Sequence, residues 1–195
     1  NNRPALTDIS GNTAEPVRWE CSCLQKKCGA CAMRINGIPS LACDSYLRDL
    51  PEEILLEPLL KFPVVQDLMI YRSVMQKNLK EAAVWMSEEA VMDERTAKDC
   101  YAASRCLQCG LCLEVCPNFD PDGEFTGAAG AVPAARVLGA SPNAAKSVTA
   151  EKYRRKVFDG CAKSLACRDI CPRKIDTENL MVNANALAIW KRKRR

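Results

Sequence analysis

The chain contains no histidine among its 195 residues. This absence excludes Rieske-type iron–sulfur ligation, in which two histidines replace two cysteines, and zinc catalysis that relies on imidazole ligands. It also excludes a nucleophile activated by a neighbouring histidine. Any reaction that this protein serves therefore proceeds without an imidazole as ligand, acid or base.

Long apolar runs are absent as well, although 48% of the residues are hydrophobic. No stretch approaches the roughly 20 consecutive apolar residues that a membrane-spanning helix needs. The first residues, Asn1 to Pro4, contain neither an initiator methionine nor the apolar core of a signal peptide. The sequence predicts no transmembrane segment and no export signal, and it indicates a fragment or a trimmed product.

Cysteine, in contrast, is abundant, with 13 residues. The odd number, the repeated CxxC steps and the lack of an export signal argue against a disulfide framework. Metal-bound thiolates in a reducing compartment explain the pattern better. Eleven of the cysteines fall into three groups, and the other two, Cys21 and Cys100, are expected to be a spare thiol and a helix-core residue.

The first group has a C-x4-C-x2-C spacing with a fourth cysteine after it, which is the spacing of plant-type [2Fe–2S] sites. Small residues such as Gly29 and Ala30 allow backbone N–H groups to approach the sulfurs. A zinc site would favour two separated CxxC pairs. The predicted [2Fe–2S] ligands are Cys23, Cys28, Cys31 and Cys43.

The second and third groups interlock. In a C-x2-C-x2-C-x3-C-P run the first three thiolates bind one cluster and the proline-flanked fourth binds its neighbour. Cys171, which also precedes a proline, is the natural fourth donor to the second group. The predicted [4Fe–4S] ligands are therefore Cys106, Cys109, Cys112 and Cys171.

The remaining site has only three thiolates, from Cys116, Cys161 and Cys167. Ser164 stands where a middle cysteine would fall in an ordinary bacterial ferredoxin. An iron corner without a thiolate is labile, so a [3Fe–4S] cluster is predicted. The alternative, a serine oxygen that holds a fourth iron, requires the hydroxyl to lose its proton.

The formal net charge is +4 when the cysteines are counted as neutral. Three oxidised clusters with their thiolates would each add roughly −2 and bring the total to about −2. The basic balance is therefore weak evidence for nucleic-acid binding, and no nucleic-acid partner is expected. The basic C-terminal residues 191–195 fit either a solvated helix end or a contact with anionic lipid.

Local patterns indicate a change of structure near residue 62. Residues 32–43 predict a β-hairpin with an Asn-Gly turn, and residues 54–60 predict another strand. Apolar spacing predicts a helix over residues 64–85, and Ser87 is the expected N-cap of a second helix that runs towards Tyr101. The fold class is α+β, with a β-rich domain over residues 1–62 and an α-helical domain over residues 63–195.

Across nearly the whole chain, this pattern resembles the iron–sulfur subunit of succinate dehydrogenase and fumarate reductase (respiratory complex II). The segments 18–23 and 28–31 are similar to the family's first loop, and residues 106–112 with Cys116-Pro117 are similar to its second. The third loop has the family's C-x5-C-x3-C-P spacing. The resemblance implies a ferredoxin-like β-grasp domain with the [2Fe–2S] cluster, then a ferredoxin-type helical domain with the [4Fe–4S] and [3Fe–4S] clusters.

By this resemblance the chain relays single electrons within an oxidoreductase complex. The partners would be a flavoprotein subunit with FAD, where succinate and fumarate interconvert, and membrane anchor subunits with a quinone. The chain itself would carry no catalytic acid or base. It would lie peripherally on the cytoplasmic or matrix face of an energy-transducing membrane.

Two departures from the family pattern matter. The family places paired strands and a helix before its first cysteine loop, so the β-grasp is expected to be partial and N-terminally truncated here. The family residues beside the quinone are replaced as well. Pro117, Phe119 and Ser164 are left either as a quinone border or as plain packing around a cluster.

Three alternatives keep part of this interpretation. The clusters could serve a soluble or thiol-linked fumarate reductase, although the chain has no C-terminal CCG-type domain. They could also belong to a free multi-cluster ferredoxin. A zinc-stapled scaffold is the structural alternative, and metal analysis separates it from the others.

Overall fold

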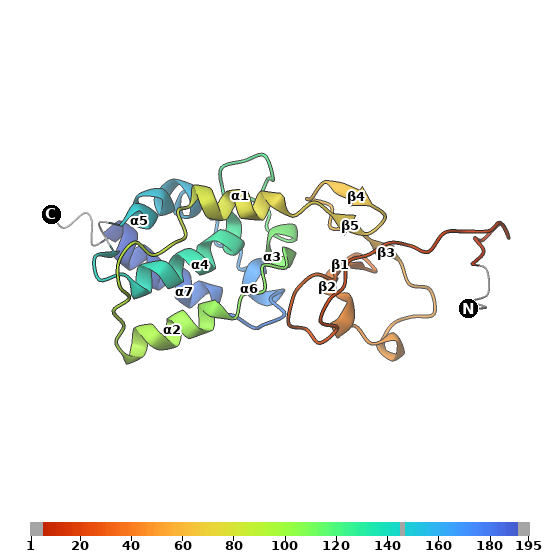
Figure 1. Cartoon of the computed structure of the whole chain (residues 1–195), viewed down its shortest axis with the longest axis horizontal. Coiled ribbons are helices and arrows are strands. Elements are labelled where there is room, and N and C mark those ends of the chain that lie inside the picture. The colour runs from red at the N-terminus through yellow and green to blue at the C-terminus, as the bar shows by residue number, and fades with distance from the viewer. Residues whose placement is uncertain (1–5, 145–146, 191–195) are drawn as a thin grey trace.

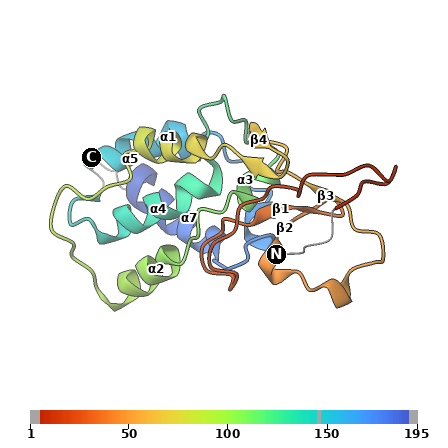
Figure 2. The same cartoon turned by 45° about the vertical axis from the view of Figure 1, so that its right-hand side comes forward.

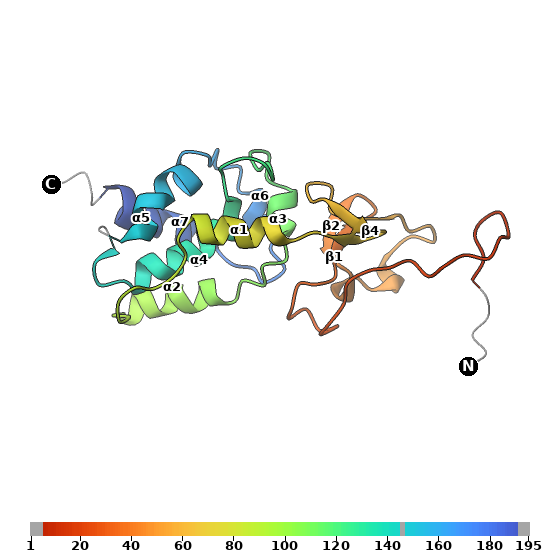
Figure 3. The same cartoon turned by 45° about the horizontal axis from the view of Figure 1, so that its top comes forward.

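The protein is described here by a computed structural model that covers residues 6–144 and 147–190. Figures 1, 2 and 3 all place the strands at one end of the molecule and the helices α2, α4, α5 and α7 at the other. Small sheets come before a series of helices along the chain. This order confirms the α+β class, and the basic tail 191–195 lies outside the described residues.

The predicted hairpin is present. Strand β1 (Ala32–Ile35) pairs antiparallel with β2 (Ile38–Leu41), and Ile35 lies opposite Ile38. Asn36 and Gly37 form the turn with φ of 50° and 78°, a left-handed geometry that these two residue types tolerate best. The turn directs the return strand back along β1, so that the chain reaches Cys43 beside the first cysteine loop.

The strand predicted over residues 54–60 is confirmed only over β3 (Leu56–Glu57), which pairs antiparallel with β1 to give the order β2-β1-β3. Leu55 N–H donates to Asn36 Oδ1 at 2.7 Å and fixes the start of this pairing. Pro58 follows directly and has no N–H for the ladder, so the strand ends there.

The helix predicted over residues 64–85 is wrong in its first part. Val64–Gln66 (β4) and Met69–Ile70 (β5) form a second hairpin, and helix α1 covers only Ser73–Glu81. Asp67 adopts a left-handed φ of 49° between the two strands. The β-branched pair Val64-Val65 favours a strand, and this local preference prevails over the helical spacing of the apolar residues.

The start of the second predicted helix is also wrong. Helix α2 runs from Glu94 to Ser104, and its N-cap is Asp93, whose carboxylate accepts a hydrogen bond from Thr96 N–H at 2.7 Å. The Thr96 side chain and then its backbone N–H lower the pKa of Asp93. An ionised aspartate at the N-terminus satisfies a free amide and complements the helix dipole, which Ser87 in the preceding loop does not do.

The remaining helices surround the cysteine groups. These helices are α3 (Leu111–Glu114), α4 (Gly127–Ala140), α5 (Val148–Tyr153), α6 (Ala166–Asp169) and α7 (Thr177–Asn185). Helix α5 continues into a wider helical turn over Arg154–Phe158, and α7 continues into one over Ala186–Trp190. The four-residue helix α6 was not predicted from the sequence.

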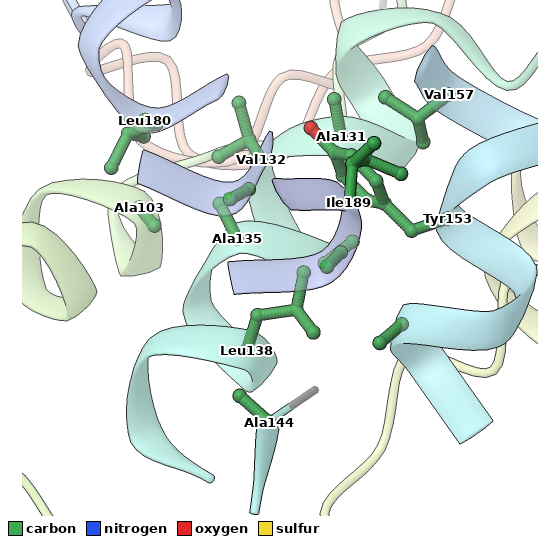
Figure 4. Close-up of a cluster of buried hydrophobic side chains, with 14 of the residues drawn as sticks. Ala103, Ala131, Val132, Ala135, Leu138, Ala144, Tyr153, Val157, Leu180 and Ile189 are labelled. Carbon is green, nitrogen blue, oxygen red and sulfur yellow. The ribbon is translucent and has the colours of Figure 1, made fainter. Parts of the chain in front are cut away.

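Helix α4 is the centre of the helical part, and nearly all of its residues are buried. Its alanines and glycines present little bulk, so α2 and α7 pack against it closely. Figure 4 shows Val132, Ala135 and Leu138 of α4 in this core, with Tyr153 and Leu180 from α5 and α7. Burial of these apolar side chains is the main stabilising contribution to this part.

A second core joins the β-rich part to the helical part. Leu59, Phe62 and Met75 pack in it with Leu111 and Leu113 of α3. The side chain of Phe62 lies against Phe119, with ring centroids 6.3 Å apart. The apolar contact is therefore continuous across residue 62, and the domain boundary expected there stays a prediction.

Glu114 of α3 is a buried acid at this junction, with a side chain only 2% exposed. Its carboxylate accepts hydrogen bonds from the N–H groups of Leu60 at 3.0 Å and Lys61 at 3.1 Å, and from Arg34 Nη1 at 3.3 Å. These donors replace the water that the carboxylate loses on burial. The junction is thus held by polar contacts as well as by apolar packing.

Within the described ranges, none of the helices combines the length with the hydropathy that crossing a bilayer requires.

We expect Glu114→Ala to lower the free energy of unfolding by about 2–4 kcal/mol, because it leaves the N–H groups of Leu60 and Lys61 and the Arg34 guanidinium without this acceptor. Glu57→Ala is the matched control. Glu57 contacts the same Arg34 at 3.5 Å, but its side chain is 31% exposed, and its loss should cost less than about 1 kcal/mol. Thermal unfolding of the cluster-loaded protein measures both, and equal losses would contradict the role given to Glu114.

Candidate metal centres

The first cysteine loop directs backbone N–H groups at sulfur. Gln25 and Lys27 N–H donate to Cys23 Sγ at 3.3 and 3.2 Å, and Lys26 N–H donates to Cys43 Sγ at 3.3 Å. The bonds from Gln25 and Lys27 lower the pKa of Cys23 to about 7. The loop therefore stabilises a thiolate at neutral pH, which is the form that binds iron.

Left-handed residues shape this loop. Leu24 and Lys26 have φ of 52° and 56°, and Gly29 has φ of 77°. Such conformations cost energy for residues other than glycine and are found where a site requires them. Here they turn successive N–H groups towards the same side of the loop, where the sulfurs lie.

The four thiols of the first group lie in two pairs. The Cys28 thiol lies beside Cys23, and the Cys43 thiol lies beside Cys31. Burial raises the pKa of Cys31, while the backbone N–H of Cys43 lowers it and the Cys43 thiol raises it. A two-iron cluster needs two thiolates on each iron, so this arrangement fits the predicted set.

The second group surrounds the start of α3. Cys106 and Cys109 precede the helix, Cys112 lies on it, and Gly110 caps it with φ of 87°. Cys171, which follows α6, is close enough to influence the ionisation of all three of the other thiols. The structure therefore brings together the four cysteines expected to share one cluster.

Burial dominates the chemistry of this group. It raises the pKa of Cys109 to about 11 and that of Cys112 well above its usual value, and the neighbouring thiols add to both effects. Buried thiols without a positive partner keep their protons. Iron supplies that positive charge when a cluster binds, so the site is built for a metal group rather than for free thiolates.

Gln108 adds a side-chain donor to the second group. Its Nε2 donates to Cys106 Sγ at 3.3 Å and to the Ala129 carbonyl of α4 at 3.0 Å. The second bond fixes the amide so that its N–H group faces the sulfur. An N–H donor to a cluster thiolate favours the more negative, reduced state of the cluster.

The third group joins Cys116, just after α3, to the loop before α6. The pKa of Cys167 is raised mainly by burial and then by the nearby thiols of Cys116 and Cys161. Cys112 of the second group is also influenced by Cys167, so the two groups adjoin. Each proline-flanked cysteine thus lies with the other group's members.

Ser164 lines the same cavity as all three thiols of the third group. Lys163 and Leu165 on either side of it adopt left-handed φ of 59° and 60°. The loop therefore bends sharply around position 164 and places the serine in the cavity that the three thiols line.

The three residues considered as a quinone border do not all line one cavity. Phe119 is only 4% exposed and packs in the core that joins the two parts. Pro117 and Phe119 line an open hollow with Leu60–Pro63, whereas Ser164 lines the cavity of the third group.

The two cysteines outside the groups lie apart from the candidate centres. Cys21 is exposed. Cys100 is buried in α2, where its thiol donates to the Arg136 carbonyl at 3.4 Å and where burial raises its pKa. The placement of Cys100 in the helix core agrees with the sequence-based prediction.

The donor sets fit iron–sulfur clusters better than single ions. Among the described residues, no three His, Cys, Asp or Glu side chains converge closely enough to hold one ion. A cluster distributes its thiolates over several iron atoms, so its ligands stand further apart. The donors of the three groups are all thiols, and N–H groups are directed at some of their sulfurs. Both features are typical of iron–sulfur cluster sites.

Sequence reasoning missed two polar residues at these centres, Gln108 and Arg72. Gln108 lies inside a CxxC step, and that position is the only signal that could have suggested it. Arg72 contacts the carbonyls of Ala30 and Cys109 in two different cysteine loops. Nothing in the local sequence of Arg72 indicates these long-range contacts.

Comparison with known families agrees with this geometry. Residues 4–77 match the model described as "2Fe-2S iron-sulfur cluster binding domain", and residues 102–175 match the model described as "4Fe-4S dicluster domain".

The chain is also similar to two curated proteins. It is 33% identical over 180 residues to the succinate dehydrogenase iron-sulfur subunit of Bacillus subtilis, which covers 86% of this chain and 70% of the relative. It is 34% identical over 187 residues to the fumarate reductase iron-sulfur subunit of Mycobacterium tuberculosis, with 88% and 74% covered.

A solved structure shares the fold. A chain of the Mycobacterium smegmatis Sdh1 complex in the apo form superposes with a TM-score of 0.74 at 23% identity, over 90% of this chain and 79% of the other. The arrangement of the small sheets and helices is therefore that of a known architecture.

Two neighbouring cysteines give a sharp test of the first centre. We expect Cys23→Ala to abolish the [2Fe–2S] EPR signal, because it removes the thiolate that receives two backbone N–H bonds. Cys21→Ala is the matched control and should keep both the signal and the iron content. Loss of the signal in Cys21→Ala, with Cys23→Ala unaffected, would contradict the assignment.

Proposed function

Because this chain belongs to the family of succinate dehydrogenase and fumarate reductase iron–sulfur subunits, we propose that it relays single electrons between a flavoprotein and a quinone. The flavoprotein would hold FAD and interconvert succinate and fumarate. The relatives are subunits of oxidoreductase complexes, and the relay between these two partners is the proposal.

The proposed ligand sets are the three predicted from the sequence. They are Cys23, Cys28, Cys31 and Cys43 for [2Fe–2S], Cys106, Cys109, Cys112 and Cys171 for [4Fe–4S], and Cys116, Cys161 and Cys167 for [3Fe–4S]. The observation that carries the proposal is the crosswise placement of Cys116 and Cys171. Ligands shared in this way hold two clusters close together, as a relay requires.

When bound, each cluster takes up and gives back one electron with little rearrangement, which divides two-electron flavin chemistry into single steps. The chain's own residues set how easily this happens. The N–H donors of the first loop and of Gln108 stabilise negative sulfur. The apolar core around α3 and α4 packs against Cys109, Cys112 and Cys116 and limits the access of water to these sulfurs.

We assign no residue of this chain to the acid–base chemistry of succinate. Proton transfer to or from carbon needs a positioned acid or base, and the chain has no histidine. The cysteines of the three groups are assigned to metal. Succinate chemistry is therefore proposed to belong to the flavoprotein partner.

At the other end, the third centre is proposed to face the quinone, on membrane anchor subunits. The chain would then lie peripherally on the cytoplasmic or matrix face of an energy-transducing membrane. Ser164 borders the cavity at this centre, and Pro117 and Phe119 border the neighbouring hollow.

Co-expression with the flavoprotein and anchor subunits tests the function. The complex, purified without oxygen, should contain iron and acid-labile sulfide. Succinate should reduce both clusters, so that the EPR signal of the reduced [2Fe–2S] cluster appears and that of the oxidised [3Fe–4S] cluster disappears. Zinc in place of iron would overturn the proposal, as would clusters that succinate leaves oxidised in the presence of active flavoprotein.

Ser164 gives a test of the third centre alone. We expect Ser164→Cys to replace the [3Fe–4S] signal with that of a second [4Fe–4S] cluster, because a fourth thiolate would then line the cavity. Ser164→Ala is the control and should keep the [3Fe–4S] signal, since the hydroxyl is not a ligand in this assignment. An undiminished [3Fe–4S] signal in Ser164→Cys would contradict it.

A further inference from the structure

The first and second cysteine loops touch each other directly. Gly29, between Cys28 and Cys31, lies so close to Cys109 that a Cβ added to the glycine would stand 2.7 Å from the Cys109 Cβ. The same added atom would lie 3.2 Å from Leu107 Cβ. No side chain fits between the two loops, so their backbones meet at this point.

One side chain joins the two loops at this contact. The Arg72 guanidinium donates from Nη2 to the Ala30 carbonyl at 2.9 Å and from Nη1 to the Cys109 carbonyl at 2.8 Å. Its Nε donates to Glu20 Oε2 at 3.0 Å. Arg72 thus binds one carbonyl of each cysteine loop through a single planar group.

The surroundings fix the orientation of this guanidinium. The side chains of Arg72 and Glu20 are 21% and 34% exposed, so the ion pair is partly shielded from water and restricts rotation of the group. Arg72 is also the N-cap residue of α1 and directly follows the β4–β5 hairpin. Its backbone is therefore held between two packed elements.

We propose that Arg72 is a positioning residue that holds the [2Fe–2S] loop and the [4Fe–4S] loop in contact and so sets the distance between these two clusters. This inference rests on the proposed function. The step that it serves moves one electron, so that the group in the first loop is oxidised as the group in the second is reduced. No bond or proton changes.

The guanidinium is suited to this role by its shape rather than by its charge alone. Its N–H groups form a rigid fork that reaches two acceptors at once, whereas a lysine ammonium is a compact charge on a flexible stem. Arg72→Lys therefore keeps the positive charge but removes the simultaneous bond to both loops. Arg72→Met removes the charge and the bonds together.

The experiment uses the cluster-loaded full chain, reduced until the first two clusters are both paramagnetic. Magnetic interaction between them speeds the electron-spin relaxation of the [2Fe–2S] signal, and this effect falls steeply with distance. We expect Arg72→Lys and Arg72→Met to lose most of this relaxation enhancement at unchanged iron and sulfide content. Arg48→Met, which removes an 80% exposed cation from the β-rich part, should retain it.

The outcomes separate positioning from electrostatics. Wild-type relaxation in Arg72→Lys, with full cluster content, would show that charge alone suffices and would overturn the inference. Wild-type relaxation in Arg72→Met would overturn it as well. If either variant loses its clusters, Glu20→Ala decides, because it keeps the guanidinium and removes the acceptor of its Nε. An intact [2Fe–2S] signal with weakened relaxation enhancement supports the role, and unchanged relaxation contradicts it.

Failure of the proposed function would appear elsewhere. A wild-type chain with clusters that show the magnetic interaction, but that succinate does not reduce in the presence of the flavoprotein, would reject the function and keep the role of Arg72. If both the proposed relay and the positioning role of Arg72 are correct, the [4Fe–4S] cluster should be reduced more slowly in Arg72→Lys than in the wild-type chain.

Discussion

The fold depends on the burial of sulfur ligands that come from distant parts of the chain. Cys171 lies with the thiols around the start of α3, and Cys116 lies with Cys161 and Cys167. Segments about fifty residues apart must therefore meet, and the contact of α3 with α6 brings them together. Helix α4 can pass close behind α3 because its residues are small. The packing of the helical part thus follows from the needs of its centres.

Ligation and packing share the same short elements. Helix α3 carries Cys112 as well as Glu114, whose buried carboxylate is bound by the N–H groups of Leu60 and Lys61. Lys61 in turn donates to the carbonyls of Cys116 and Phe119. A displacement of the β-rich part would therefore shift ligands of two centres, so the junction and the sites have to be stable together.

Local sequence patterns predicted those features that depend on residues close together in the chain. The Asn-Gly turn predicted the β1–β2 hairpin, and the cysteine spacing predicted which thiols lie together. The first part of the helix predicted over residues 64–85 was wrong because the β-branched pair Val64-Val65, the left-handed Asp67 and the pairing of β4 with β5 favour a hairpin over the helical spacing of the same apolar residues. Arg72 was missed because its partners Ala30 and Cys109 lie 42 and 37 residues away.

The first two centres act on the ionisation of their thiols in opposite directions. At Cys23, N–H donors lower the pKa of the thiol, whereas at Cys109 and Cys112 burial raises it. N–H donation and burial act on a bound cluster in the same way, because reduction adds negative charge to it. N–H donors favour that charge, and burial opposes it. Gln108 supplies a donor to sulfur inside the buried centre and offsets part of this cost. Neighbouring centres can therefore differ in how readily they accept an electron even though four thiolates are proposed for each, and a relay with direction requires such a difference.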